Sequence, residues 1–320
     1  YLLISQINDV WQLYIFYGVV IGIGSCVFTP AASTVARWFI RRRTAMTGVV
    51  ISGVGAGVLI VPVVADRLIQ AYGWRTSFII IGIALLVIAT LAAQFTRSDP
   101  HRIGQHAYGE HDLATEGGHV DIPSLSLKET VRTWQFWVIF LMLVCFGYCL
   151  LAIQVHLVPY LTDIGFSAAI AASLVALPGG TSIIGRIPLG ILGDRIGNKK
   201  AFIVGFILLL VSLVLLLFTR EIWGLYLFAV IFGIAYGTCA VQQAPLLAAL
   251  FGVRSLGVIF GAAGMGFTLG AAAGPFISGY IFDTTSSYFL AFIICIIVCA
   301  IGMTLIIILK PPRTKYAGIG

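Results

Sequence analysis

Long apolar runs, separated by short polar or glycine-containing turns, follow one another along almost the whole chain. The runs cover residues 12–36, 44–65, 76–96, 134–158, 168–192, 200–219, 222–250, 255–282 and 287–309. Each run has about 20 residues or more, which is the length that an α-helix needs to cross roughly 30 Å of hydrocarbon. The pattern therefore predicts an all-α polytopic membrane protein with nine complete transmembrane helices.

The composition supports a membrane protein and argues against a soluble one. The chain is 60% hydrophobic and only 10% charged, and its mean hydropathy is +1.05. Soluble domains contain about 25% charged residues. A chain with so few charges cannot cover its surface with polar groups in water, so we expect the lipid bilayer to surround it.

Positive charge is distributed unevenly between the two ends of the predicted helices. With the turn at 37–43 placed in the cytoplasm, most lysines and arginines fall on that side, namely Arg37, Arg41, Arg42, Arg43, Arg97, Arg102, Lys128, Arg132, Arg195, Lys199, Lys200, Arg254, Lys310, Arg313 and Lys315. The outer side holds only Arg67, Arg75 and Arg220. This bias predicts a multi-pass protein of the plasma or inner membrane with a cytoplasmic C-terminus. It also accounts for the net charge of +7 without a nucleic-acid partner.

Neither the cysteines nor the short motifs indicate enzyme chemistry. All six cysteines lie within predicted spans, and no histidine stands beside them to complete a metal site. We interpret them as small apolar packing residues. The sequence has no zinc-protease, hydrolase or phosphate-loop motif. We therefore predict no enzymatic activity, no metal and no cofactor.

Two homologous halves organise the chain. Trp11-Gln-Leu-Tyr-Ile-Phe16 recurs 212 positions later as Trp223-Gly-Leu-Tyr-Leu-Phe228. A series of basic, glycine and proline positions recurs with an offset of 213, pairing Arg41, Gly48, Gly53, Gly57 and Pro62 with Arg254, Gly261, Gly266, Gly270 and Pro275. Parallel repeats are typical of transporters whose substrate site lies between the halves near the midplane. Chance similarity between glycine-rich helices is the alternative.

The repeat predicts a domain division. We expect a truncated N-terminal bundle over 1–98, a cytoplasmic linker over 99–130, a C-terminal bundle over 131–310 and a cytoplasmic tail over 311–320. The second half shows six spans and the first only three with the end of a fourth, so upstream helices are expected to be missing from this fragment. The linker is polar, and we interpret it as solvated and flexible. Its histidines (His101, His106, His111 and His119) do not share a helix face, which disfavours a metal or pH-sensing role.

Glycines recur at every fourth position in the run 255–282. Gly257 and Gly261 form one pair, and Gly266, Gly270 and Gly274 form a second series. Such spacing places hydrogen-only surfaces on one helix face and allows neighbouring backbones to approach closely. We predict that this face packs against another helix.

One charged residue lies deep inside an apolar run. Arg186 is the only charged residue between Asp163 and Asp194. A cation at bilayer depth costs several kcal/mol unless an anion or polar group meets it, so it is a candidate functional residue. Eight residues of helix place it about 12 Å from Asp194, and its planar guanidinium suits a carboxylate bound through two hydrogen bonds. The alternative is a structural arginine bonded to backbone carbonyls.

Several motifs resemble those of the major facilitator superfamily. The segment from Arg37-Trp-Phe-Ile-Arg-Arg-Arg-Thr to Gly57 resembles the start of the fifth helix in its monocarboxylate-porter-like and oxalate:formate-antiporter-like members. His156-Leu-Val-Pro-Tyr-Leu-Thr-Asp163 and Gly185-Arg186 resemble the seventh and eighth helices of the same branch. Gly190-x-x-x-Asp194-Arg195-x-Gly197 resembles the loop motif of the whole superfamily. The resemblance covers the chain from the end of helix three to helix twelve.

The resemblance implies a fold of two pseudo-symmetric helical bundles, with nine of twelve helices present. It also implies that Arg186 binds the carboxylate of a small organic anion. Ser182 stands where family members often carry a carboxylate, which weakens an ion-pair proton relay here. No second lysine or arginine falls within 255–282, so a monoanion is favoured over a dianion.

Further site residues come from the same resemblance. Polar positions on the helices that line the cavity in this superfamily are Thr29, Tyr148, Gln154, Tyr236, Gln242 and Gln243. The adjacent pair Gln242 and Gln243 serves equally well for hydrogen bonds between helices. His156 is the only histidine in a span and is a candidate for carrying a coupled proton; anchoring at the interface is its alternative.

The cytoplasmic motif residues have a different predicted role. We expect Asp194 with Arg195, and Arg41 to Arg43, to form ionic locks between helices on the cytoplasmic face, in a gate that does not touch the substrate. Gly190, Gly197 and Lys199 belong to the same motif.

These inferences converge on a secondary active transporter for a small, monocarboxylate-like organic anion. It would work by alternating access, either as a proton symporter or by exchange with a counter-anion. An efflux transporter for drug-like or neutral solutes is one alternative. A non-transporting receptor or scaffold with the same fold is another.

Overall fold

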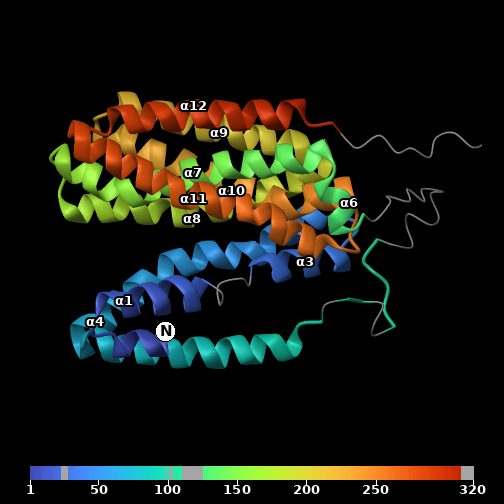
Figure 1. Ribbon diagram of the computed structural model, residues 1–320, viewed down its shortest axis with the longest axis horizontal. Coiled ribbons are helices and arrows are strands. Elements are labelled where there is room, and N and C mark those ends of the chain that lie inside the picture. The colour runs from blue at the N-terminus through green and yellow to red at the C-terminus, as the bar shows by residue number, and fades with distance from the viewer. Residues whose placement is uncertain (23–27, 98, 101–103, 110–124, 311–320) are drawn as a thin grey trace, which may run out of the picture.

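The protein consists of long helices that run roughly parallel to one another, as the computed structural model shows in Figure 1. The structure describes residues 1–22, 28–97, 99–100, 104–109 and 125–310. Within these residues the only β-type contact is one isolated bridge between Phe39 and Tyr108. Most of the linker, including His101, His111 and His119, and the predicted tail 311–320 lie outside the described residues.

The first group of helices precedes the linker. It comprises the 3-10 helix η1 (Leu2–Gln6), the short helix α1 (Val10–Leu13), the π-helical η2 (Tyr14–Ile21), α3 (Phe28–Trp38) and α4 (Arg43–Phe95). A short helix, α6 (Leu127–Val131), lies at the end of the linker. It begins with a capping box, because Ser126 and Glu129 exchange side-chain and backbone hydrogen bonds.

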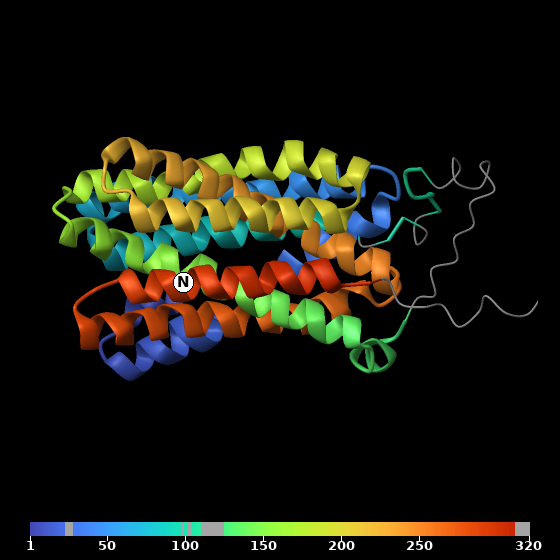
Figure 2. The same ribbon diagram turned by 90° about the horizontal axis from the view of Figure 1, so that it is seen from above.

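The second group contains six helices of 20 to 30 residues. They are α7 (Trp134–Asp163), α8 (Ala168–Ile196), α9 (Asn198–Phe218), α10 (Ile222–Phe251), α11 (Leu256–Thr285) and α12 (Phe289–Ile308). Seen from above, these helices lie side by side along the long axis of the molecule (Figure 2).

Seven helices are long and apolar enough to cross a membrane, namely α4 and the six helices α7 to α12. This number differs from the nine expected spans for two reasons. Two expected spans, 44–65 and 76–96, belong to α4, whose 53 residues are interrupted only by the non-helical backbone of Gly73 (φ 73°, ψ 162°). The expected span 12–36 is divided among α1, η2 and α3, with residues 23–27 outside the description. At Gly73 the chain turns, and the second part of α4 runs back beside the first (Figure 1).

Glycine contacts join α7 and α11 closely. A Cβ atom placed on Gly270 would collide with the Val144 carbonyl oxygen, and one on Gly274 would collide with the Tyr148 carbonyl oxygen. Gly266 meets the Phe140 carbonyl oxygen in the same way. The second glycine series therefore packs as predicted. Gly261 does not, because nothing lies within 4 Å of its added Cβ.

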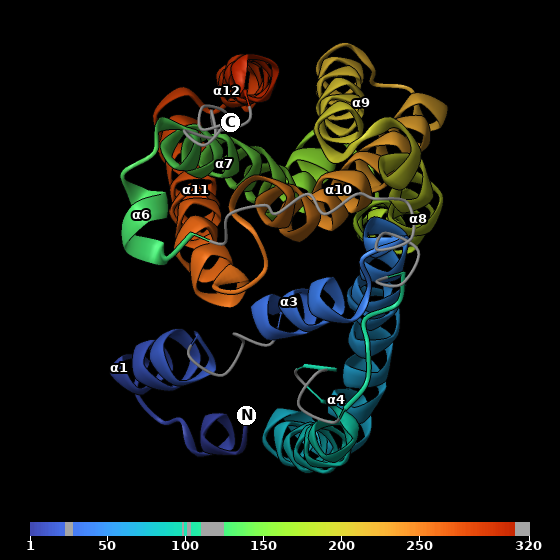
Figure 3. The same ribbon diagram turned by 90° about the vertical axis from the view of Figure 1, so that its right-hand side faces the viewer.

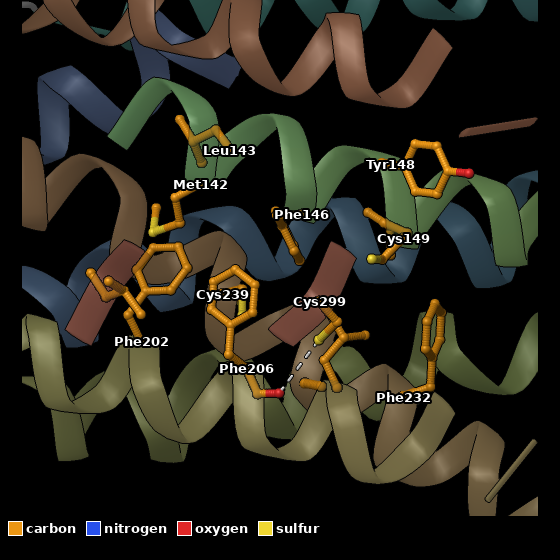
Figure 4. Packing of buried hydrophobic residues seen from close by; sticks show 14 of the residues in the cluster. Met142, Leu143, Phe146, Tyr148, Cys149, Phe202, Phe206, Phe232, Cys239 and Cys299 are labelled. Atoms are coloured by element: carbon orange, nitrogen blue, oxygen red, sulfur yellow. Dashed lines mark hydrogen bonds between the residues drawn. The ribbon is translucent and has the colours of Figure 1, made fainter. Parts of the chain in front are cut away.

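Aromatic side chains and cysteines fill the centre of the second group. Phe146, Phe202 and Phe206 are fully buried, and Figure 4 shows them beside Cys239 and Cys299. The Cys299 thiol donates to the Phe206 carbonyl oxygen at 3.8 Å, and the Cys149 thiol donates to that of Cys295 at 3.2 Å. The five described cysteines are all buried and unpaired, which confirms the packing role, while Cys26 lies outside the described residues.

The two groups of helices meet along α4 and α8, as the end-on view shows (Figure 3). A second, smaller contact brings α3 to α11, where the rings of Phe28 and Phe260 lie 5.8 Å apart. In this view α3 lies between α4 and the second group.

Candidate functional site

Arg186 lies about two thirds of the way along α8 and is completely buried, with 0% of its surface exposed. None of its three guanidinium nitrogens has a hydrogen-bond partner among the described residues. The same description shows no ion pair between Arg186 and a carboxylate. An isolated buried cation costs several kcal/mol. The structure therefore disfavours the alternative in which Arg186 is held by backbone carbonyls.

An aromatic ring and a glycine face flank the guanidinium of Arg186. On α10, the ring centroid of Tyr236 lies 4.9 Å from its central carbon, a distance at which a cation and an aromatic face attract each other. On α4, a Cβ atom placed on Gly55 would lie 2.7 Å from Nη1. Three helices thus enclose the charge, and neither flanking group neutralises it.

Gln242 is the only other residue of the predicted binding set that contacts α8 through a hydrogen bond in the described structure. Its side-chain amide donates to the Leu189 carbonyl oxygen at 3.2 Å. Its own carbonyl oxygen, Oε1, is buried without a partner. This contact lies one turn from Arg186 and leaves a free acceptor next to α8.

The remaining predicted binding residues lie away from Arg186 or make no specific contact with it. Tyr148 packs in the α7–α11 contact, where its hydroxyl and the Ser278 hydroxyl are both buried without a hydrogen-bond partner among the described residues. Its side chain points away from Phe206 and Cys299 (Figure 4). Gln154 on α7 and Thr29 on α3 are partly exposed, and Gln243 on α10 is buried. Their assignment to a substrate site stays a prediction.

His156 connects α7 to α11 and to the start of α12. Its Nε2 lies 2.9 Å from the Pro275 carbonyl oxygen, and its Nδ1 lies 3.3 Å from the Tyr288 hydroxyl. Because a carbonyl oxygen only accepts hydrogen bonds, Nε2 carries the proton and donates. Nδ1 then accepts from Tyr288 in the neutral ring. The rings of His156 and Tyr288 also pack with centroids 5.3 Å apart.

Asp194 joins the two groups of helices at one end of the α4–α8 contact. Its two carboxylate oxygens accept hydrogen bonds from the backbone N–H groups of Thr44 and Ala45, each at 2.9 Å. The Thr44 hydroxyl donates to Asn198 at 2.8 Å. The carboxylate thus caps the N-terminus of α4, a position that favours negative charge. The predicted lock is present as a cap on backbone amides rather than as a pair with an arginine side chain.

The other motif residues support this junction from both sides. A Cβ atom on Gly190 would lie 3.0 Å from the Thr44 carbonyl oxygen, and Gly197 adopts a φ of 91° where α8 gives way to α9. Lys199 donates to the carbonyl oxygens of Ile307 and Leu309 at 2.8 and 2.7 Å. It therefore binds the C-terminus of α12, not the first group of helices.

The basic turn before α4 has its own contacts. Arg43 donates from Nε to the Phe39 carbonyl oxygen at 3.0 Å, while Arg42 occupies the N-cap with a left-handed φ of 58° and no side-chain cap. Arg41 and Arg195 are exposed. The missing local cap explains why the first amides of α4 are available to Asp194.

No group of three potential metal ligands lies together in the parts of the chain that the structure describes. The residues that the sequence did not single out are Gly55, Thr44 and Asn198. Gly55 was hidden between Gly53 and Gly57 in a glycine-rich run, and only the packing shows which of the three meets Arg186.

Comparison with known proteins identifies the family. A family model described as Major Facilitator Superfamily matches residues 1–190 and 158–319. The chain belongs to this superfamily. The overlapping matches cover nearly the whole sequence, as expected where two halves of a protein resemble each other.

The similar curated proteins are named as transporters and not as enzymes. Monocarboxylate transporter 12 of Mus musculus is 26% identical over 318 residues, which cover 92% of this chain and 65% of that protein. Monocarboxylate transporter 11 of Homo sapiens is 30% identical over 303 residues, covering 90% of this chain and 61% of that protein. The chain thus spans somewhat less than two thirds of the length of these relatives.

A solved structure supports the fold. The superfamily transporter FucP, crystallised in the outward conformation, aligns with a TM-score of 0.51 over 97% of this chain and 93% of that chain, at 13% identity. At this identity the match concerns the fold alone. The chain is therefore a multi-pass helical membrane protein of the major facilitator superfamily.

Proposed function

We propose that this protein transports a small organic monoanion across the membrane by alternating access. Membership in the major facilitator superfamily and similarity to two proteins named monocarboxylate transporters support transport of a carboxylate. The single observation that carries the proposal is the buried, unpartnered guanidinium of Arg186 at the contact between the two helix groups.

A carboxylate suits the hydrogen-bond donors and the charge of Arg186. Arg186 offers two or more N–H donors in one plane, which match the two oxygens of a carboxylate. Binding would neutralise the cation and remove much of the cost of burying it. Because no other lysine or arginine falls within residues 168–192 or 255–282, the site favours one negative charge over two.

The contact between α4 and α8 would change during transport. The Asp194 cap and the close contacts of Gly48 and Gly55 with α8 support a form closed at the end where α4 begins. With that end in the cytoplasm, as the positive-inside rule favours, this form would face outward in the proposed cycle. In this proposed arrangement α4 supplies the spans 44–65 and 76–96, joined at Gly73, the expected span 12–36 would be a third, and the C-terminus would be cytoplasmic after nine spans.

Proton coupling would use His156. Its ring bridges α7, α11 and α12, and Nδ1 could take up a proton if the Tyr288 hydroxyl turned to accept. Uptake by a His156→Gln variant should then lose its dependence on an inward proton gradient. Counter-anion exchange is the alternative, and it predicts uptake that depends on internal carboxylate and not on the gradient.

The test of the function is uptake into proteoliposomes that contain the purified chain with radiolabelled acetate, lactate or benzoate outside. Two charged hydrogen bonds contribute about 1.5–3 kcal/mol each, so Arg186→Ala should reduce uptake about 100-fold or more. Arg220→Ala, at an exposed arginine, is the matched control and should leave uptake unchanged. Unchanged uptake by a folded Arg186→Ala variant would rule out the proposed role of Arg186. Uptake of a drug-like cation by the unaltered protein would favour the efflux alternative.

A further inference from the structure

Three neighbouring glycines of α4 differ in what surrounds them. An added Cβ atom on Gly55 would lie 2.7 Å from Arg186 Nη1, 2.8 Å from the Gly179 carbonyl oxygen and 2.8 Å from Ile183 Cγ1. The same atom on Gly53 or Gly57 would meet nothing within 4 Å. Only Gly55 lies where any side chain would occupy the space that now holds the guanidinium.

The groups around this space confine the guanidinium but form no hydrogen bonds to it. Tyr236 covers one side of the charge, and the bare backbone of α4 at Gly55 lies on the other. The helix backbone at Gly48 approaches the Arg186 carbonyl oxygen as well, so α4 and α8 cannot shift toward each other. The arginine is therefore restricted in orientation while all of its donors remain free for a ligand.

We infer that Gly55 is a positioning residue for the anion site. By lacking a side chain it gives the guanidinium of Arg186 a slot on α4, and this slot fixes the donors for a bound carboxylate. A methyl group at position 55 would push the guanidinium toward Tyr236 and away from that orientation. The inference rests on the proposed function for the nature of the ligand. The contact between Gly55 and Arg186 does not depend on that function.

The first measurement is the KM for carboxylate uptake in proteoliposomes, with acetate, lactate and benzoate as probes. Gly55→Ala should raise KM about tenfold, which corresponds to about 1.4 kcal/mol. Gly53→Ala and Gly57→Ala are matched controls on the same helix and should leave KM unchanged. Equal KM values for all three variants would overturn the positioning role.

A double-mutant cycle on the purified protein tests the contact independently of transport. Gly55→Ala should lower the thermal midpoint in the unaltered chain, and it should lower it clearly less in an Arg186→Met background, where the guanidinium no longer fills the slot. Equal losses in both backgrounds would mean that the methyl group meets only the α8 backbone, and the inference would fail. If the cycle shows coupling but the unaltered chain takes up none of the probes, the proposed function fails and the Gly55–Arg186 contact stands.

A separate observation concerns the described part of the linker. The Tyr108 N–H donates to the Trp38 carbonyl oxygen at 2.8 Å, and the Tyr108 carbonyl oxygen accepts from the N–H groups of Ile40 and Arg41 at 3.0 and 3.2 Å. The rings of Tyr108 and Phe39 lie 5.9 Å apart. The linker is therefore attached here to the turn between α3 and α4, although the sequence suggested a solvated, flexible segment.

This attachment lies directly before the amides that Asp194 caps. The turn held by Tyr108 ends at Arg41, and the capped amides belong to Thr44 and Ala45. The Trp38 indole also donates to the Arg97 carbonyl oxygen at 2.7 Å, which ties the end of α4 to the same turn. We propose that residues 104–109 act as a strap that orders the start of α4 and so stabilises the closed α4–α8 junction.

Hydrogen exchange of the backbone amides in the peptide 43–48 tests the strap. Tyr108→Pro removes the donor to Trp38 and should speed exchange of this peptide about tenfold, whereas Tyr108→Ala keeps the backbone bonds and should change it little. Peptides from α9 and α10 report whether the fold is intact and should exchange as in the unaltered chain. If Tyr108→Pro leaves both regions unchanged, the strap has no influence on the junction.

Discussion

Two close helix contacts of this protein use glycine in the same way but differ in what lies beside it. In the α7–α11 contact, Gly266, Gly270 and Gly274 meet backbone carbonyl oxygens of α7 directly. In the α4–α8 contact, Gly48 and Gly55 meet Arg186, and the helix end is held by the Asp194 carboxylate. The second contact contains an unpaired buried cation, Arg186.

The difference indicates which contact is permanent and which can open. Backbone packing between α7 and α11 gains dispersion energy at every turn and loses it all on separation. The α4–α8 contact carries a desolvation cost at Arg186 that opening would relieve. We interpret α7–α11 as part of a rigid unit and α4–α8 as the moving interface.

The largest expected effect tests the cost of the unpaired cation. Arg186→Met should stabilise the folded protein by about 3 kcal/mol, because it removes a buried charge that has no partner. The measurement is the thermal midpoint in detergent without carboxylate. Arg195→Met, at an exposed position, serves as the control. A lower midpoint for Arg186→Met would mean that the arginine has a stabilising partner after all.

The second effect tests the permanent contact. Gly270→Ala should destabilise the protein by about 2 kcal/mol, because its Cβ would meet the Val144 carbonyl oxygen and force the two helices apart. Gly264→Ala in the same helix, with nothing within 4 Å, should not destabilise it. Similar midpoints for both variants would show that the close α7–α11 packing contributes nothing.

The third effect tests the end of the moving interface. Asp194→Asn weakens a charge-assisted cap and should shift the balance of conformations by about 1 kcal/mol toward opening at that end. Spin labels at the exposed residues Tyr72 and Trp223 should then move closer together, because the opposite ends of the helices close. Asn198→Ala removes only a neutral hydrogen bond and should shift the distance less. An unchanged distance between the two spin labels in Asp194→Asn would show that the cap does not influence the balance of conformations.

The smallest effect concerns α6, which lies outside both contacts. Hydrogen bonds from the Ser126 N–H and hydroxyl lower the pKa of Glu129. A lowered pKa stabilises the folded helix above the ordinary Glu value of about 4.3, and this stabilisation is lost as the pH falls through the lower folded value. Amide exchange in 126–131 should therefore accelerate in that acid range in the unaltered chain. Glu129→Gln should remove the pH dependence, and a dependence that persists would assign it to another group.

The sequence alone determined the helical, membrane-embedded class of the protein and several of its residues of interest. Run length and the shortage of charge require helices in lipid, because an unpaired backbone cannot cross hydrocarbon. Arg186 was recognisable because a cation is rare at that depth, and the capping box at Ser126 was recognisable because it depends on four consecutive residues. These inferences need no knowledge of which helices are neighbours.

Only the tertiary structure decided which faces meet. In helices that are apolar on every side, the sequence pattern does not indicate which face of the helix turns toward its neighbours. Gly55 could therefore not be distinguished from Gly53 and Gly57. Nor could the sequence tell that Asp194 binds the amides of Thr44 and Ala45, since charge alone pointed to the neighbouring arginines. Those amides are free because Arg42 provides no cap, and their availability is a property of backbone geometry across two helices that lie 150 residues apart in sequence.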